Sequence, residues 1–136
     1  MTTFPVFGVA GSGVTVYRKW LDAISDNLSN INTVRPEGEA VFQARMVVAR
    51  SVQLQEGVGG AQVAGIELGG DPAGRMVYEP DHPYADAEGY VRRPDIDMAS
   101  QMAQLIMAQR GYQANLSVVD RARDAYSAAV NVGRNS

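Results

Sequence analysis

The chain has 136 residues, with 12 Lys and Arg against 15 Asp and Glu, a net charge of −3 and no cysteine. This length suits one domain with a modest core. The small negative charge offers no basic surface for phosphates, so a nucleic-acid partner is not expected. Without cysteine there is neither a disulfide framework nor Cys-ligated zinc. Arg18 and Lys19 interrupt the first apolar run and no positive charge precedes it, so we expect neither membrane insertion nor a cleaved signal peptide.

The first predicted element is a helix from about Val9 to Ile31. Its apolar positions alternate spacings of three and four residues, which is typical of a helix with a narrow apolar seam. Gly11, Ser12 and Gly13 lack the lysine and spacing of a phosphate-binding loop, so they indicate a close helix contact or a flexible helix start. The seam residues are Val14, Tyr17, Leu21, Ile24, Leu28 and Ile31.

The middle of the chain, residues 36–93, holds most of the prolines and glycines and predicts short strands. Alternation from Phe42 to near Leu54 indicates a half-buried strand. Residues 57–60 are rich in glycine and predict a turn into a second strand from Gln62 to Leu68. A third short strand is predicted from Arg75 to Tyr78.

The last predicted element is a long helix that begins after residues 94–97, where Asp95 or Asp97 is placed to cap it, and ends near Val132. Gly111 interrupts it at a cost of about 1 kcal/mol relative to Ala. Asn115 lies beside the seam, where its need for a hydrogen-bond partner favours one register. The seam repeats every seven residues at Met98, Leu105, Tyr112, Val119 and Tyr126, completed by either Met102, Leu116 and Val130 or Ala108, Ala122 and Ala129.

The predicted fold class is α+β, with long N- and C-terminal amphipathic helices packed as a coiled-coil-like bundle and a small β-rich middle region. We expect residues 1–35 and 94–136 to form the helical core and residues 36–93 to form a hairpin-containing middle with extended loops. The apolar seams of both predicted helices must pack against another surface. Periodicity alone leaves a helical hairpin within one chain and packing between chains about equally favoured.

No group of residues indicates catalysis, a cofactor or a metal. His82 is the single histidine and is interpreted as a solvated turn residue. Asp95 and Asp97 precede a helix, where capping explains them without acid–base chemistry. We therefore predict no enzyme, no cofactor and no metal site. A monomeric binding module for one partner is the leading alternative, and an enzyme acting on the cell wall is a remote one.

Three segments resemble the bacterial flagellar rod and hook family. Residues 26–33 resemble the Asn-rich signature at the end of its first helix, while residues 77–83 with 85–91, and residues 111–115, are more specific to basal-body rod proteins. Two positions depart from the family pattern: Gly111 replaces a common Ser, and Ile31 replaces a common Ala. The residues that make the resemblance are Asn27, Asn30, Asn32, Thr33, Tyr78, Pro80, Pro83, Gly89, Tyr90 and Gln113.

The resemblance implies a structural subunit of the proximal rod that polymerises helically and transmits torque from the MS ring to the distal rod and hook. The implied partners are copies of itself, other rod proteins, the adaptor between rod and MS ring, the MS-ring protein, and the flagellar type III export apparatus. The implied location is the basal body. Before assembly we expect the terminal helices to be weakly ordered. The expected subunit-interface residues are Val14, Tyr17, Leu21, Ile24, Leu28, Ile31, Met98, Met102, Leu105, Tyr112, Asn115, Leu116, Val119 and Tyr126.

Overall fold

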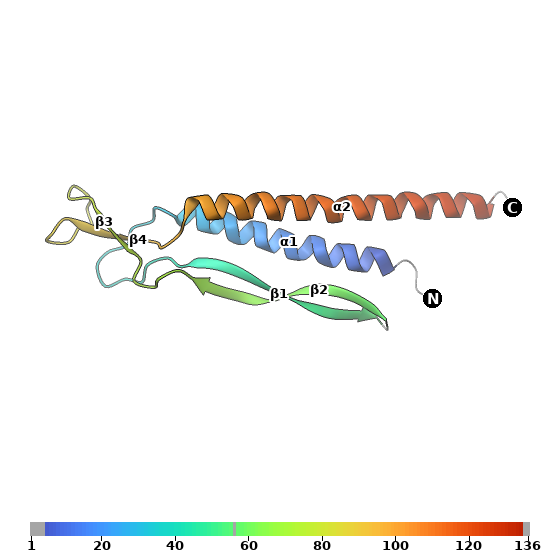
Figure 1. Ribbon diagram of the computed structural model, residues 1–136, viewed down its shortest axis with the longest axis horizontal. Coiled ribbons are helices and arrows are strands. Elements are labelled where there is room, and N and C mark those ends of the chain that lie inside the picture. The colour runs from blue at the N-terminus through green and yellow to red at the C-terminus, as the bar shows by residue number, and fades with distance from the viewer. Residues whose placement is uncertain (1–4, 56, 135–136) are drawn as a thin grey trace.

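The computed structural model describes residues 5–55 and 57–134, and it confirms the α+β class and both long helices. The two helices are the first and last elements of the chain, and two small antiparallel sheets come between them in the sequence. The whole molecule is elongated (Figure 1). In chain order the elements are α1 (Pro5–Asn30), β1 (Ala44–Gln55), β2 (Val58–Gly69), β3 (Arg75–Tyr78), β4 (Tyr90–Arg93) and α2 (Met98–Arg134).

The two helices pack side by side within one chain and run in opposite directions (Figure 1). Because α2 has 37 residues and α1 has 26, α2 continues past the start of α1. Ala108 is fully buried, whereas Met102 and Leu116 are 47% and 38% exposed. Of the two alternatives for the α2 seam, the alanine side therefore faces α1. The buried and half-buried positions of this face are Gln101, Leu105, Ala108, Tyr112, Asn115, Val119 and Ala122.

Strands β1 and β2 form a long hairpin that lies along α1 (Figure 1). The first strand agrees with the prediction, but the second begins at Val58, four residues before the predicted Gln62. Gly57, with φ of 77°, belongs to the turn. Gly60 instead lies within β2, where a Cβ atom would come within 2.7 Å of the Leu54 side chain. Gly60 therefore leaves room for the Leu54 side chain of the paired strand and does not form the turn.

Strands β3 and β4 form a second hairpin, of which the sequence predicts only β3. Asp86 organises the connecting loop, since its Oδ1 accepts hydrogen bonds from the backbone N–H groups of Glu88 and Tyr90. Gly89 follows with φ of 85°, a left-handed conformation that favours glycine. We call residues 31–43 and 70–97 the head. It lies at the end of the molecule where α1 ends and α2 begins (Figure 1).

The small apolar core lies at the junction between the head and the helices. Ile31, Ala44 and Ile96 are buried there, with Phe42 packed against them. Ile31 directly follows α1, Ala44 begins β1, and Ile96 lies in the segment before α2. The junction therefore joins the helix pair, the β1–β2 hairpin and the head. Long stretches of the helix surface stay exposed.

Candidate assembly surfaces

Asn27 ties the junction together through a buried hydrogen-bond network. Its side chain is 2% exposed. The amide nitrogen donates to the backbone oxygen of Arg45 and to Oε1 of Gln101, both at 3.0 Å, while its Oδ1 accepts from the Arg45 backbone N–H at 2.7 Å. One side chain thereby fixes α1, β1 and α2 relative to each other. The sequence indicates Asn27 only as part of a helix end and does not single out Gln101.

A second set of polar contacts lies just after the end of α1 and ties the first segment of the head to the β3–β4 hairpin. Asn32 Oδ1 accepts a hydrogen bond from Arg93 at 2.7 Å, and Arg93 also pairs with Glu79 just after β3. The Arg93 side chain is 25% exposed, so it is not simply a solvated residue. Nearby, Asn30 closes the helix end: its amide donates to the Asp26 carbonyl and its Oδ1 accepts from the Thr33 hydroxyl. Asn27, Asn30 and Asn32, which carry the family resemblance, thus each have a structural partner.

Two glycines let the helices approach closely. A Cβ atom at Gly13 would overlap the side chain of Asn115, and one at Gly111 would overlap the ring of Tyr17. Each helix thus places a glycine opposite a large side chain of the other. Asn115 donates to the Gly111 carbonyl at 2.8 Å, so its bond stays within α2, whereas the predicted register role calls for a partner across the seam. The predicted close contact at residues 11–13 holds for Gly13, whereas nothing lies within 4 Å of a Cβ at Gly11.

Ser12 connects the hairpin to α1. Its hydroxyl donates to the Val9 carbonyl at 2.6 Å and accepts from the Ala61 backbone N–H at 3.0 Å. The side chain therefore bridges α1 and β2 close to Gly60. No phosphate-binding geometry is needed to explain this segment.

The predicted interface residues fall into three groups. Ile24 and Ile31 are buried within the chain. Half-buried positions in or beside the helix pair are Val14, Tyr17, Leu21, Leu28, Leu105, Tyr112, Asn115 and Val119. Exposed positions are Met98, Met102, Leu116 and Tyr126. The first two groups can stabilise the single chain, and the third is accessible to a neighbour.

One flank of α2 is rich in exposed apolar side chains. Met98, Met102, Ile106 and Leu116 are between 38% and 52% exposed, and helical periodicity places them on the same side of α2. We call these four residues the α2 flank. Sequence reasoning misses Ile106 because it fits neither version of the seven-residue repeat. Large apolar side chains gathered on one surface are typical of an interaction site.

An apolar groove of ≈ 260 Å³ lies between α1 and β1, lined by Val16, Tyr17, Trp20, Val47 and Ala49. Trp20, the single tryptophan, donates from Nε1 to Oε1 of Gln104 on α2 at 3.4 Å. Met102 and Ile106 each lie two residues from Gln104, which places them about 160° away around α2. The groove and the α2 flank therefore lie on opposite sides of the helix pair.

The residues considered for chemistry have structural partners instead. Asp97 caps α2 by accepting from the Ser100 backbone N–H at 2.7 Å, and Asp95 accepts from the Asp71 backbone N–H at 2.9 Å. His82 Nδ1 accepts from the Tyr84 backbone N–H within a turn of the head. In the described part of the chain, no three His, Asp or Glu side chains gather as metal ligands. Neither described helix is long and apolar enough to cross a membrane.

Comparison with known proteins gives the class of the molecule. The family model described as "Flagellar basal body rod FlgEFG protein C-terminal" matches residues 87–132, which span β4 and most of α2. The chain is thus similar to flagellar rod proteins over the segment that supplies the α2 face of the helix pair.

Relatives extend the similarity to nearly the whole chain. The flagellar basal-body rod protein FlgC of Yersinia enterocolitica is 32% identical over 136 residues, covering 98% of this chain and 100% of the relative. FlgC of Salmonella typhimurium is 30% identical over 135 residues, and FlgC of Bacillus subtilis 29% over 150 residues, each with 98% and 100% coverage. The chain belongs to the FlgC family of flagellar basal-body rod proteins. It is a structural subunit of the basal body and not an enzyme, and it assembles with other rod components.

Proposed function

We propose that this chain is a subunit of the proximal rod, where many copies and related rod proteins pack helically and transmit torque from the MS ring to the distal rod and hook. Its further partners are the adaptor between rod and MS ring, the MS-ring protein, and the flagellar type III export apparatus. Full-length similarity to FlgC proteins of distant bacteria is the observation that supports this role. The helical core of residues 1–35 and 94–136 is the part proposed to line the rod interior.

The α2 flank and the apolar groove suggest how neighbouring subunits pack. A surface that fits a different surface on the next copy makes a heterologous contact, and such a contact repeats into a helical stack when it does not close. The α2 flank projects methionine and isoleucine side chains, which adapt to irregular apolar sites. The groove offers Tyr17, Trp20 and Val47 on the opposite side of the helix pair. We propose that the flank of one subunit enters the groove of the next.

Cysteine crosslinking tests this packing, because the chain has no cysteine of its own. The variant Ala49→Cys with Met102→Cys places one thiol at the groove and one on the α2 flank, which are too far around the molecule to join within one chain. In purified basal bodies we expect a short bismaleimide to produce crosslinked dimers and larger products. The matched control is Ala49→Cys with Ala114→Cys, since Ala114 is also exposed but lies on the half of α2 that faces away from the flank.

The possible outcomes test the rod function and the contact between groove and α2 flank separately. A chain that is absent from purified basal bodies, in a strain that swims, contradicts the proposed rod function. A chain present in basal bodies without crosslinks in the double variant contradicts the groove contact and leaves the rod function standing. Equal crosslinking of the control pair also contradicts the groove contact.

A further inference from the structure

The backbone of β1 turns hydrogen-bonding groups toward the apolar groove. In an antiparallel pair, successive residues direct their N–H and C=O groups alternately toward the partner strand and away from it. Arg45 bonds through both groups to Asn27 of α1, so its pair with Leu68 is not hydrogen-bonded and its backbone points away from β2. Two residues further along β1, the backbone of Val47 points away from β2 as well.

A contact at the other end of the hairpin gives the same direction for Ala49. The Ala61 N–H on β2 donates to Ser12, so Ala61 and its partner Ser51 are not hydrogen-bonded to each other. Ala49 lies two residues before Ser51 with no register shift between them, so its backbone also points away from β2. Val47 and Ala49 both line the groove. In the part of the chain that the structure describes, no group outside the hairpin bonds to their backbone atoms.

The bond between Asn27 and Arg45 shows which side chain satisfies such a strand edge. The Asn27 amide donates to the Arg45 carbonyl at 3.0 Å and accepts from the Arg45 N–H at 2.7 Å. An Asn or Gln side chain carries the donor and the acceptor in one planar, uncharged group. The strand edge that continues into the groove is therefore suited to carboxamide side chains of a partner.

The α2 flank of the same chain carries two such side chains. With 3.6 residues per turn, Gln109 and Gln113 fall on the same side of α2 as the apolar residues of the flank. Both are exposed, and neither side chain has a hydrogen-bond partner among the described residues. The two glutamines are about 6 Å apart along the helix, and Val47 and Ala49 are about 7 Å apart along the strand. One helix can therefore supply a carboxamide to each of the two groove residues.

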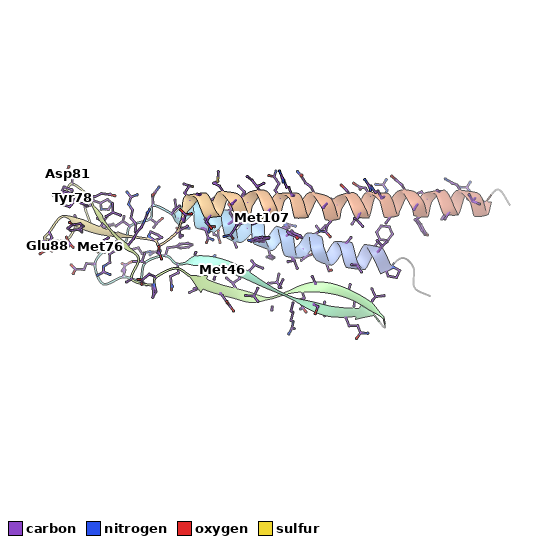
Figure 2. The ribbon with its side chains drawn as sticks, in the orientation of Figure 1. Met46, Met76, Tyr78, Asp81, Glu88 and Met107 are labelled. Carbon is purple, nitrogen blue, oxygen red and sulfur yellow. The ribbon has the colours of Figure 1, made fainter. Side chains whose placement is uncertain are left out.

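The glutamines and the groove lie at nearby levels of the molecule. Both β1 and α2 begin beside the head and run away from it (Figure 1). Figure 2 labels Met46, which precedes Val47, and Met107, two residues before Gln109, and the two methionines lie at similar positions along the long axis. Within one chain the flank and the groove lie on opposite sides of the helix pair. Two copies that stand side by side, with little displacement along the axis, can bring them together.

We propose that Gln109 and Gln113 of one copy bind the β1 backbone at Val47 and Ala49 of a second copy beside it, as Asn27 binds Arg45 within the chain. The inference rests on the proposed rod function and assigns the polar part of the groove contact. A wholly apolar surface in the groove would bury the N–H and C=O groups of β1 without partners, which is costly. The two glutamines therefore select the α2 flank over other apolar surfaces.

Replacement of the glutamines distinguishes this contact from a purely apolar one. Gln109→Met with Gln113→Met makes the flank more apolar, so a purely apolar contact would be kept or strengthened. We expect the double variant to fall about tenfold in purified basal bodies, because the groove backbone then lacks its partners. The matched control is Gln62→Met, at an exposed glutamine of β2 outside both surfaces, which should be incorporated at the wild-type level. Incorporation of the double variant at or above the wild-type level overturns the proposal.

Amide hydrogen exchange tests the backbone side of the contact without a substitution. In the purified monomer, the amides of Val47 and Ala49 should exchange faster than those of Met46 and Arg50, which point toward β2. In basal bodies that contain the chain, exchange at Val47 and Ala49 should slow by at least about tenfold, while Met46 and Arg50 change little. Exchange at Val47 and Ala49 that stays as fast as in the monomer overturns the proposal.

A photoreactive side chain identifies the partner. A diazirine-bearing amino acid in place of Ala49 should, on illumination of purified basal bodies, give a dimer joined to an α2 peptide that contains Gln109 or Gln113. A link from this position to a different protein overturns the assignment of a second copy. These outcomes leave the rod function standing, whereas absence of the unaltered chain from the basal bodies of a swimming strain contradicts that function itself.

Discussion

The ring of Tyr17 on α1 lies directly over Gly111 on α2, and a Cβ atom at position 111 would overlap it. This contact requires glycine at position 111, where the resemblance to the family leads us to expect Ser. The usual cost of a glycine inside a helix, about 1 kcal/mol, is offset here by the packing of a large aromatic ring. Gly111 and Tyr17 are thus expected to behave as a coupled pair.

The first prediction concerns this pair. Gly111→Ser should lower the free energy of unfolding by about 1–3 kcal/mol, because the added atoms overpack the contact with the ring. Tyr17→Leu should remove most of this penalty, which a double-mutant cycle by chemical denaturation measures. Gly11→Ser is the matched control, since nothing lies within 4 Å of a Cβ there. Additive effects at positions 17 and 111 would contradict the coupling.

The second prediction concerns the buried amide at the junction. Asn27→Ala leaves the Arg45 backbone groups and the Gln101 side chain without their partner, so stability should fall by about 2–4 kcal/mol. Asn131→Ala, in the exposed part of α2, should change it by less than about 0.5 kcal/mol. Thermal and chemical unfolding of both variants provide the comparison. Similar small losses for both would show that the network does not hold the junction.

The sequence predicts the helices well because their apolar spacing persists over many turns. It does not decide which side of α2 faces α1, since Met102 and Leu116 are apolar as Ala108 is. Only the close approach of α1 places the small Ala108 side chain between the helices. It misses β4 because four residues that include two arginines lack strand periodicity until β3 pairs with them. It also misses Gln101 and Arg93, whose partners are distant in the sequence. The domain division and the interface residues remain predictions.

A third prediction tests the seam itself. Leu21→Asp or Leu105→Asp introduces a charge at a half-buried position of the helix pair, where an unpaired carboxylate is costly. Each change should abolish swimming and remove the chain from basal bodies, while backbone amide signals of β1 and β2 keep their dispersion in NMR spectra of the purified protein. Asp22→Asn, an exposed neighbour, is the control. Normal swimming with either aspartate would refute the role of the seam.

The last prediction concerns the order of the helices before assembly. Of the described residues of α2, only Gln101 and Ala108 are buried, and both lie in its first third. Helices that lack packing are marginal in water. Amide hydrogen exchange of the purified monomer should therefore be fastest in residues 121–134 of α2, and fast in the first turn of α1. Slower exchange is expected around Ile24 and Ala108, where the helices cover each other. In isolated basal bodies the amides of residues 121–134 should become protected, because neighbouring subunits then pack against this part of α2. Strong protection of both helix ends in the monomer would mean that α1 alone stabilises α2, and that assembly adds contacts without adding order.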